Sequence, residues 1–318
     1  MKIKRIAVPI VSSKPCLRSV KKNIQVLREY GVEVLISPLL SELLRKDHER
    51  KSDDCEFGKP EERARDIHWA LDQRADLIIC ACGGSGAGRV IRLIQKRKIL
   101  DSYTPIMGFS DCTHLLNLWA SLGVRAFSGP CFEDSHEYIL KAIKHIEEGK
   151  PSIISAETAR FINIYNDFRV RGLFGQNLTC FISALVNSKL SEAQAFIFED
   201  IFCDYGRKGA EYSFESVLDV IEAFGIFDKV TLWGTITNVR NSNSHIEKRI
   251  KRPAALNLPY GHFSKNYWMP IPLGYDIMVE IIPSKKAVKI YEQKSKKIFN
   301  KVWNNEERNR TRKLMKLE

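Results

Sequence analysis

Short apolar runs alternate with amphipathic stretches through the first half of the chain. The apolar runs cover residues 5–11, 32–38, 75–82, 104–109 and 125–130. The stretches with helical periodicity cover residues 19–31, 61–73, 89–100, 111–123 and 135–148. Strands that alternate with helices in this way predict a mainly parallel sheet covered on both faces, in a domain spanning residues 1–150.

The pattern changes after residue 150. Residues 151–175 are mixed in character and predict an extended linker, and a second α/β or α+β unit follows at residues 176–284. Its predicted helices cover residues 177–188 and 213–225, and its predicted strands cover residues 194–200, 229–236 and 276–282. A site is expected in the cleft between two such domains, beyond the carboxyl ends of the parallel strands.

Charge is concentrated at the end of the chain. The net charge is +12, but residues 285–318 hold twelve Lys or Arg and four Glu, which leaves only +4 for the rest. Their few apolar residues are weakly periodic, so we expect a solvated basic helical tail. Nucleic-acid binding is not expected, because no recognised module accompanies the tail, whose role stays open.

The start of the chain gives no sign of export. The apolar stretch at residues 6–11 is too short for a signal peptide and contains Pro9. No run approaches the ~18 apolar residues of a membrane helix. We therefore expect a cytoplasmic protein that does not bind membranes.

The eight cysteines are expected to be reduced thiols, at positions 16, 55, 80, 82, 112, 131, 180 and 203. A metal cluster would have to combine Cys80, Cys82, Cys112 and His114, but no CxxC pair is present and the first two lie in an apolar run. Neither a metal nor another cofactor is expected.

The loop "CGGSGAGR" at residues 82–89 lies between a predicted strand and a predicted helix. Its spacing does not match the dinucleotide-binding fingerprint, and the acidic residue that would hold a ribose is missing. Its glycines still allow close approach of a ligand to backbone amides, which suit a phosphate or an oxyanion.

Ser110 lies at a strand-to-helix junction, in "GFSD". A serine there serves as a helix N-cap or as a nucleophile in a sharp turn that Gly108 permits, although Cys112 replaces the glycine usual after such a serine. Both interpretations remain open from spacing alone.

A serine nucleophile needs a base and a carboxylate that orients it. Of the seven histidines, His262 is the best candidate for the base because it lies in a Pro/Gly-bearing loop. His114 is one turn along the helix that Ser110 begins, and we expect it to have a structural role. Glu199 ends an apolar run where a charge is costly, and its neighbour Asp200 is the competing carboxylate.

Five ordered motifs resemble the LD-carboxypeptidase family of serine peptidases, which includes the microcin immunity peptidases. The family's stretch before its glycine loop is similar to residues 58–84, its nucleophile segment to "IMGFSDCTHLL", and its G-G-N-L to "GQNLT". Its strand ending in Glu-Asp is similar to "FIFED", and its G-H followed by P-L-G to "GHFSKNYWMPIPLG". The resemblance spans nearly all of residues 1–283.

The resemblance implies a catalytic triad of Ser110 as nucleophile, His262 as general base and acid, and Glu199 as the residue orienting His262. Its oxyanion hole would use the glycine loop at Gly83 and Gly84 and the amide of Asp111.

It also implies an N-terminal Rossmann-like domain, a C-terminal swivelling β/α domain and a homodimer. The implied substrate is a murein-derived peptide, cleaved at an amide next to a terminal carboxylate. An aminoacyl or peptidyl nucleotide antibiotic is the alternative substrate. A non-catalytic ligand-binding module is the alternative from another class.

The chain departs from the family pattern at several positions. Cys82 replaces the usual arginine before the two glycines, Gln176 replaces the second glycine of G-G-N-L, and "SGP" from Ser128 replaces H-G-P. These changes leave the implied triad intact but are expected to reshape the pocket around it.

Overall fold

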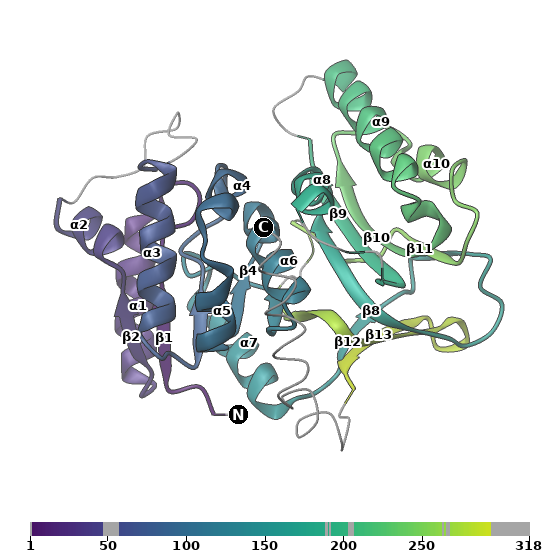
Figure 1. Ribbon diagram of the computed structural model, residues 1–318. Helices are drawn as coiled ribbons and strands as arrows, with labels where there is room; N and C mark the ends of the chain where they lie inside the picture. The colour runs from purple at the N-terminus through teal and green to yellow at the C-terminus, as the bar shows by residue number, and fades with distance from the viewer. Residues whose placement is uncertain are drawn as a thin grey trace, which may run out of the picture.

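The structure, a computed structural model, describes residues 2–46, 57–187, 190, 192–202, 207–262, 264 and 268–293. Its N-terminal domain is built on five parallel strands in the order β2-β1-β3-β4-β5, as the alternating pattern predicts (Figure 1). They are β1 (Arg5–Val8), β2 (Glu33–Ile36), β3 (Leu77–Ile79), β4 (Ile106–Gly108) and β5 (Ala126–Ser128). The strand order reverses between β1 and β3, where doubly wound sheets form ligand sites.

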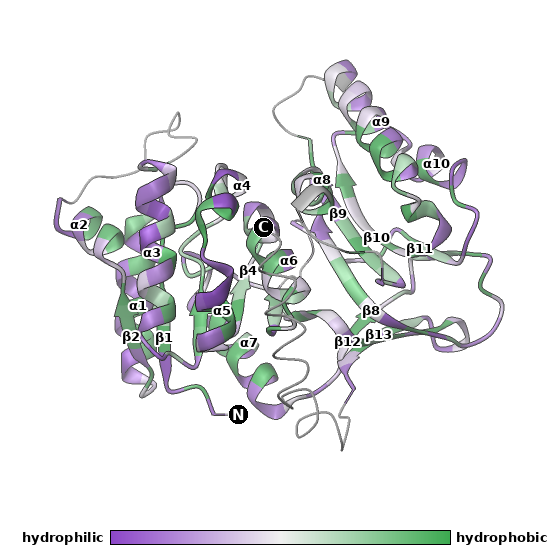
Figure 2. Ribbon diagram, in the orientation of Figure 1, coloured by the Kyte–Doolittle hydropathy of each residue, from purple (hydrophilic) through white to green (hydrophobic). Residues whose placement is uncertain are grey.

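Helices cover both faces of this sheet. Buried apolar side chains of one face pack with α1 (Leu17–Glu29), α2 (Pro38–Lys46) and α7 (His136–Glu148). Those of the other face pack with α3 (Pro60–Asp72), α4 (Ala87–Val90), α5 (Lys96–Ser102) and α6 (Thr113–Ser121). Figure 2 shows α3 and α5 turning mainly hydrophilic residues toward the viewer, as amphipathic covering helices do.

The helix predicted over residues 89–100 is interrupted. It is divided into α4, the short 3₁₀ helix η1 (Ile91–Leu93) and α5, because Ile94 and Gln95 have extended backbones. The β-branched residues Val90, Ile91 and Ile94 weaken helix propensity in this stretch, and all three are buried against the core instead.

The C-terminal domain has four parallel strands flanked by antiparallel ones, in the order β12-β8-β9-β10-β11-β7. Its strands are β6 (Ser152–Ser155), β7 (Arg160–Ile162), β8 (Phe168–Asn177), β9 (Ala195–Ile201), β10 (Val230–Thr237), β11 (Ala254–Leu256), β12 (Ile271–Ile282) and β13 (Ala287–Glu292). Its helices are α8 (Leu178–Asn187), α9 (Arg207–Ala223), η3 (Ile226–Asp228), α10 (Ser242–Glu247) and η4 (Pro283–Lys285).

Residues 151–175 differ from the expected linker. They supply β6, β7 and most of β8, so the C-terminal domain begins close to residue 152. The strand β6 alternates buried and exposed residues, but it is only four residues long, and β7 only three. Such short strands leave a weak pattern in the sequence, because their pairing partners lie far along the chain.

The segment expected as a basic helical tail also begins differently. Residues 287–292 form β13, which pairs with both β12 and β6, because Val288 and Ile290 are buried on one side of it. The part of the predicted tail at residues 294–318 lies outside the described residues. No helix in the described ranges is long and apolar enough to cross a bilayer.

One strand belongs to both sheets. The start of β12 pairs antiparallel with β5, through Ile271, Pro272 and Leu273, and its remainder pairs with β8 and β13. The register along β8 shifts after Gly274, whose φ is +141°.

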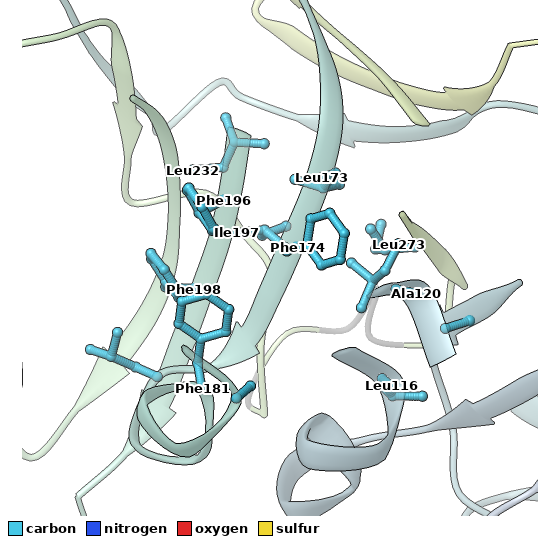
Figure 3. Close-up of a cluster of buried hydrophobic side chains, with 14 of the residues drawn as sticks. Leu116, Ala120, Leu173, Phe174, Phe181, Phe196, Ile197, Phe198, Leu232 and Leu273 are labelled. Carbon is cyan, nitrogen blue, oxygen red and sulfur yellow. The ribbon is translucent and has the colours of Figure 1, made fainter. Parts of the chain in front are cut away.

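An apolar core also crosses the junction of the domains. Figure 3 shows Phe174, Phe181 and Phe198 of the C-terminal domain packed in the same cluster as Leu116 and Ala120 of α6. The two domains therefore share both a strand and a core.

Candidate active site

The turn after β4 presents Ser110 in a constrained conformation. Ser110 opens the 3₁₀ helix η2 (Ser110–Cys112) with φ +57°, in the left-handed region that costs a non-glycine residue of order 1–2 kcal/mol. Gly108 precedes it, and a Cβ there would lie 2.8 Å from Cys112 Cβ and 3.1 Å from Cys80 Sγ. The glycine is thus required by close packing, while the strain of the sharp turn falls on the serine, as at a nucleophile elbow.

The cap interpretation of Ser110 is only partly right. Ser110 does begin the helical segment, but its side chain makes no capping hydrogen bond, and the N-cap positions of η2 and α6 are Phe109 and Cys112. The backbone carbonyl of Ser110 instead accepts a hydrogen bond of 2.6 Å from Thr113 Oγ1. The serine hydroxyl is therefore not committed to the helix start.

The glycine loop lies directly against this turn. A Cβ on Gly83 would be 3.0 Å from Ser110 Cβ, and a Cβ on Gly84, whose φ is +109°, would be 2.0 Å from Ser13 Oγ. Ser13 holds the loop by donating its amide to the Gly83 carbonyl (3.3 Å) and by accepting the amide of Ser85 at Oγ (3.1 Å). Both glycines are thus needed for the loop to approach the serine.

The carboxylate and the imidazole come from the other domain. Glu199 lies on β9 with no exposed surface, and its Oε2 is 2.6 Å from His262 Nδ1 in the loop after β11. Oε2 also accepts the His262 backbone amide at 3.3 Å. This bond holds the Nδ1 proton toward Glu199 and leaves Nε2 of the ring for chemistry.

Gly261, before the histidine, allows the loop to pass over Glu199. Its φ is +116°, and a Cβ there would lie 2.9 Å from Glu199 Cβ and 3.1 Å from Oε2. A glycine is therefore needed before His262, because any side chain at this position would collide with Glu199.

The structure separates the roles of the two neighbouring carboxylates. Asp200 points to the opposite side of β9, where it accepts hydrogen bonds from Asn177 Nδ2 (2.9 Å) and from the backbone amides of Thr179 (2.7 Å) and Ile201 (2.6 Å). It anchors the start of α8, whereas Glu199 faces His262.

Burial and charge act in opposite directions on the Glu199–His262 pair. Burial lowers the pKa of His262, but the hydrogen bond and negative charge of Glu199, together with the charges of Asp200 and Asp134, raise it above the ordinary histidine value. Burial also raises the pKa of Glu199, against the opposing effect of His262. An imidazolium formed next to Glu199 is consequently stabilised.

One pocket joins the two halves. It has a volume of about 270 Å³ and is lined by Gly83, Gly84, Phe109, Ser110, Cys131, Glu133, Asp134 and His262. Ser110 and His262 thus face the same space, with the rings of Phe109 and His262 in contact at 4.7 Å between centroids. Two carboxylates line the pocket, and no lysine or arginine is among these described lining residues.

The two substitutions expected to reshape the pocket act at a distance from it. Cys82 is buried and donates its thiol to the Ser13 carbonyl, and Gln176 is buried with its Oε1 2.5 Å from Thr113 Oγ1. Neither is among the described residues that line the pocket. Gln176 has a φ of +111°, which explains why a glycine suits this position in the family motif.

The cysteines and His114 do not form the metal cluster considered from the sequence. The described cysteines at positions 16, 80, 82, 112, 131 and 180 are free thiols. His114 does not join Cys80, Cys82 and Cys112, the cluster weighed from the sequence. Its ring instead faces Asp111 and Ser183.

Asp111, His114 and Cys180 form a cluster that sequence reasoning missed, with ligand atoms within 4.8 Å of one another. Asp111 also binds the start of α4 by accepting the Ala87 amide at 2.8 Å. The i, i+3 spacing of Asp111 and His114 gives a signal in the sequence, whereas nothing local to Cys180 links it to them.

The N-terminal domain resembles known proteins in sequence. Residues 6–129 match the family model described as the LD-carboxypeptidase N-terminal domain. A putative carboxypeptidase of Treponema pallidum is 29% identical over 120 residues, which are 35% of this chain and 36% of that protein. The chain thus matches about a third of the length of this curated relative.

Solved structures resemble the whole chain. MccF in complex with glutamyl sulfamoyl guanosine has a TM-score of 0.71 at 16% identity, covering 92% of this chain and 97% of that one. The MccF-like protein of Bacillus anthracis has a TM-score of 0.70 at 16% identity, covering 92% and 98%. An MccF-like protein of Streptococcus pneumoniae in complex with AMP has a TM-score of 0.67 at 18% identity, covering 91% and 99%.

At these identities the structures establish the fold, which is the two-domain α/β fold of the MccF proteins. The family model and the curated relative add the sequence signal of the N-terminal domain. The N-terminal domain therefore matches the LD-carboxypeptidase family model, and the chain as a whole has the fold of the MccF proteins.

Proposed function

We propose that the protein is a serine carboxypeptidase-type hydrolase that cleaves an amide next to a terminal carboxylate, with murein-derived peptides as its substrates. The observation that carries this proposal is the Glu199–His262 hydrogen bond of 2.6 Å, which faces Ser110 across a shared pocket. A nucleophile, a base and an orienting carboxylate are the parts that acyl transfer requires.

In the proposed mechanism, Ser110 Oγ attacks the carbonyl carbon while His262 Nε2 takes the hydroxyl proton. Glu199 stabilises the imidazolium that forms, because its carboxylate is buried against Nδ1. The amides of Gly83, Gly84 and Asp111 are proposed to stabilise the oxyanion.

His262 then gives its proton to the leaving amine, and an acyl-enzyme remains on Ser110. A water molecule, deprotonated by His262, attacks the acyl group, and collapse of the second tetrahedral intermediate regenerates Ser110 and releases the acid.

The charge of the pocket orients the substrate in this proposal. Glu133 and Asp134 are held in place by the backbone amides of Cys16 and Cys131, both at 2.7 Å. A terminal carboxylate is repelled by these two side chains, so we place it on the side of the pocket away from them. An ammonium group of the substrate would face Glu133 and Asp134.

A second substrate class is supported by the whole-chain fold. The structural relatives include MccF bound to glutamyl sulfamoyl guanosine and to aspartyl sulfamoyl adenosine. In this alternative, the protein hydrolyses the amide of an aminoacyl or peptidyl nucleotide, with the same Ser110 chemistry.

Mass spectrometry of products from a mixed panel tests both substrate classes. Release of D-alanine from a murein tetrapeptide supports the first, and cleavage of an aminoacyl sulfamoyl adenylate supports the second. Ser110→Ala should abolish turnover, whereas Ser216→Ala, which removes an exposed hydroxyl on α9, should not.

The proposal fails if wild-type protein shows neither Ser110-dependent hydrolysis nor labelling by a serine-directed fluorophosphonate. Ligand binding under those conditions would support a non-catalytic binding module instead. The homodimer implied by the family resemblance and the cytoplasmic location expected from the sequence remain proposals, and analytical ultracentrifugation and cell fractionation test them.

A further inference from the structure

The side chains of Asp111, His114 and Cys180 form a cluster next to the nucleophile and have no role in the proposed mechanism, which uses only the backbone amide of Asp111. Asp111 follows Ser110 in η2, His114 is in the first turn of α6, and Cys180 is on α8 of the other domain. Asp111 is 4% and His114 is 8% exposed, so water screens the two side chains little. Two domains thus bring an oxygen, a nitrogen and a sulfur ligand together.

The contact between His114 and Asp111 is long for a hydrogen bond. His114 Nε2 lies 3.5 Å from Asp111 Oδ1, whereas ordinary N–H···O bonds are about 2.7–3.2 Å. Zinc bonds of about 2.0–2.3 Å at tetrahedral angles separate two ligand atoms by about 3.3–3.6 Å, which includes this distance. Cys180 Sγ is within hydrogen-bonding distance of the same oxygen at 3.8 Å, and a bound zinc ion would draw the sulfur closer by a few tenths of an ångström.

The hydrogen bonds of His114 also favour a cation in this cluster. The Ser183 hydroxyl donates to the Cys180 carbonyl at 2.9 Å, and its oxygen is 2.5 Å from His114 Nδ1. A hydroxyl that gives its one proton to a carbonyl accepts from Nδ1–H, which places the ring's lone pair on Nε2. Nε2 and the carboxylate oxygen then face each other as two acceptors, an arrangement that a cation between them stabilises.

The other groups around the cluster match those of metal sites. A histidine ligand commonly donates its second nitrogen to a neighbouring oxygen, as His114 does to Ser183. The second oxygen of Asp111 accepts the Ala87 amide, which fixes the carboxylate. Gly88 makes space for the imidazole, since a Cβ there would lie 3.0 Å from His114 Cε1.

We propose that Asp111, His114 and Cys180 bind a zinc ion that ties the two domains together next to Ser110. Nitrogen, sulfur and carboxylate ligands in a tetrahedral arrangement suit Zn²⁺, with a water molecule as the fourth ligand. The ion joins η2 and α6 of the N-terminal domain to α8 of the C-terminal domain. It therefore fixes the turn that carries the nucleophile relative to the domain that carries His262.

Metal binding by the full-length protein tests this site independently of any hydrolysis. Metal-stripped protein is dialysed against micromolar zinc and its metal content measured, and cobalt is titrated as a spectroscopic probe. We expect about one zinc ion per chain and a thiolate-to-cobalt charge-transfer band with tetrahedral absorption.

Cys180→Ala should remove the charge-transfer band and weaken zinc binding by about tenfold or more, whereas Cys16→Ala, which removes an exposed thiol, should bind as wild type. Wild-type protein that takes up no zinc would overturn the proposal directly, with no need for a folded variant. Cys180→Ala with the wild-type band and affinity would also overturn it, and would leave a hydrogen-bonded cluster only.

Discussion

Replacing Glu199 by Gln removes one negative charge from the proposed triad and leaves its shape. The side chain is fully buried, and its Oε2 is 2.6 Å from His262 Nδ1. A glutamine oxygen can still accept the Nδ1 proton, so the ring keeps its orientation, but it no longer stabilises the imidazolium formed when Ser110 is deprotonated. The variant therefore isolates the electrostatic contribution of Glu199.

The size of the effect follows from the geometry. Charge centres about 4 Å apart interact by about 4 kcal/mol at an effective dielectric constant near 20. Each 1.36 kcal/mol changes a rate tenfold, so kcat/KM of Glu199→Gln should fall by about 10³-fold. The corresponding Asp-to-Asn substitution in chymotrypsin-like proteases lowers kcat by about 10⁴-fold, where the wrong histidine tautomer adds to the loss of charge.

The pH profile supplies a second readout. The proposed base must be neutral to accept the Ser110 proton, so activity is lost as the pH falls through the pKa of His262. In wild type, burial lowers this pKa, and Glu199 together with Asp200 and Asp134 raises it above the ordinary histidine value. Without the Glu199 charge, burial is opposed only by more distant carboxylates such as Asp200 and Asp134, so the acid limb of kcat/KM should move to lower pH.

Stability serves as the control for this variant. Burial raises the pKa of Glu199, so the ionised form is destabilised in the folded protein, increasingly as the pH rises above the unfolded-state pKa. A neutral glutamine removes this cost, and the Tm at pH 7 should be unchanged or higher. Glu199→Gln with activity within tenfold of wild type and an unmoved acid limb would refute the proposed role of Glu199.

Two further substitutions test other parts of the site. Ser110→Gly and Ser110→Ala both lack the nucleophile, but glycine relieves the φ of +57°, so urea unfolding should show Ser110→Gly more stable by about 1 kcal/mol; equal stability would contradict the strained turn. Glu133→Gln should raise KM about three- to fivefold for a substrate with an ammonium group, because a part-exposed ion pair contributes about 0.5–1 kcal/mol. An equal change for the matched N-acetylated substrate would argue against an ammonium subsite at Glu133.

The N-terminal domain was predictable because its fold follows from the order of strand and helix patterns along the chain. Apolar strands and amphipathic helices alternate, and parallel neighbours place the loops at residues 83 and 110 at one edge of the sheet. The choice between Glu199 and Asp200 was not predictable in the same way. Adjacent strand residues point to opposite faces, and only the path of the loop at residues 261–262 decides which face meets a histidine.

Features that depend on distant pairing were missed. Strand β12 starts at Ile271, five residues before the predicted strand, in a stretch with Pro272 and Gly274 that disfavours sheets. Its pairing with β5 stabilises it there. The cluster around Asp111 was missed for the same reason, since Cys180 approaches only because α8 packs on α6.

The strand shared between the sheets determines how this architecture can be divided. A fragment ending near residue 150 would leave β5 without β12, so an apolar edge strand would be open to pairing with other chains. Designed chimeras that exchange the C-terminal domain would need to keep residues 271–273 matched to β5 of the N-terminal domain. The folding unit that contains the N-terminal sheet therefore includes residues 271–273, far along the chain. The two domains cannot be exchanged as independent pieces by cutting the chain once between them.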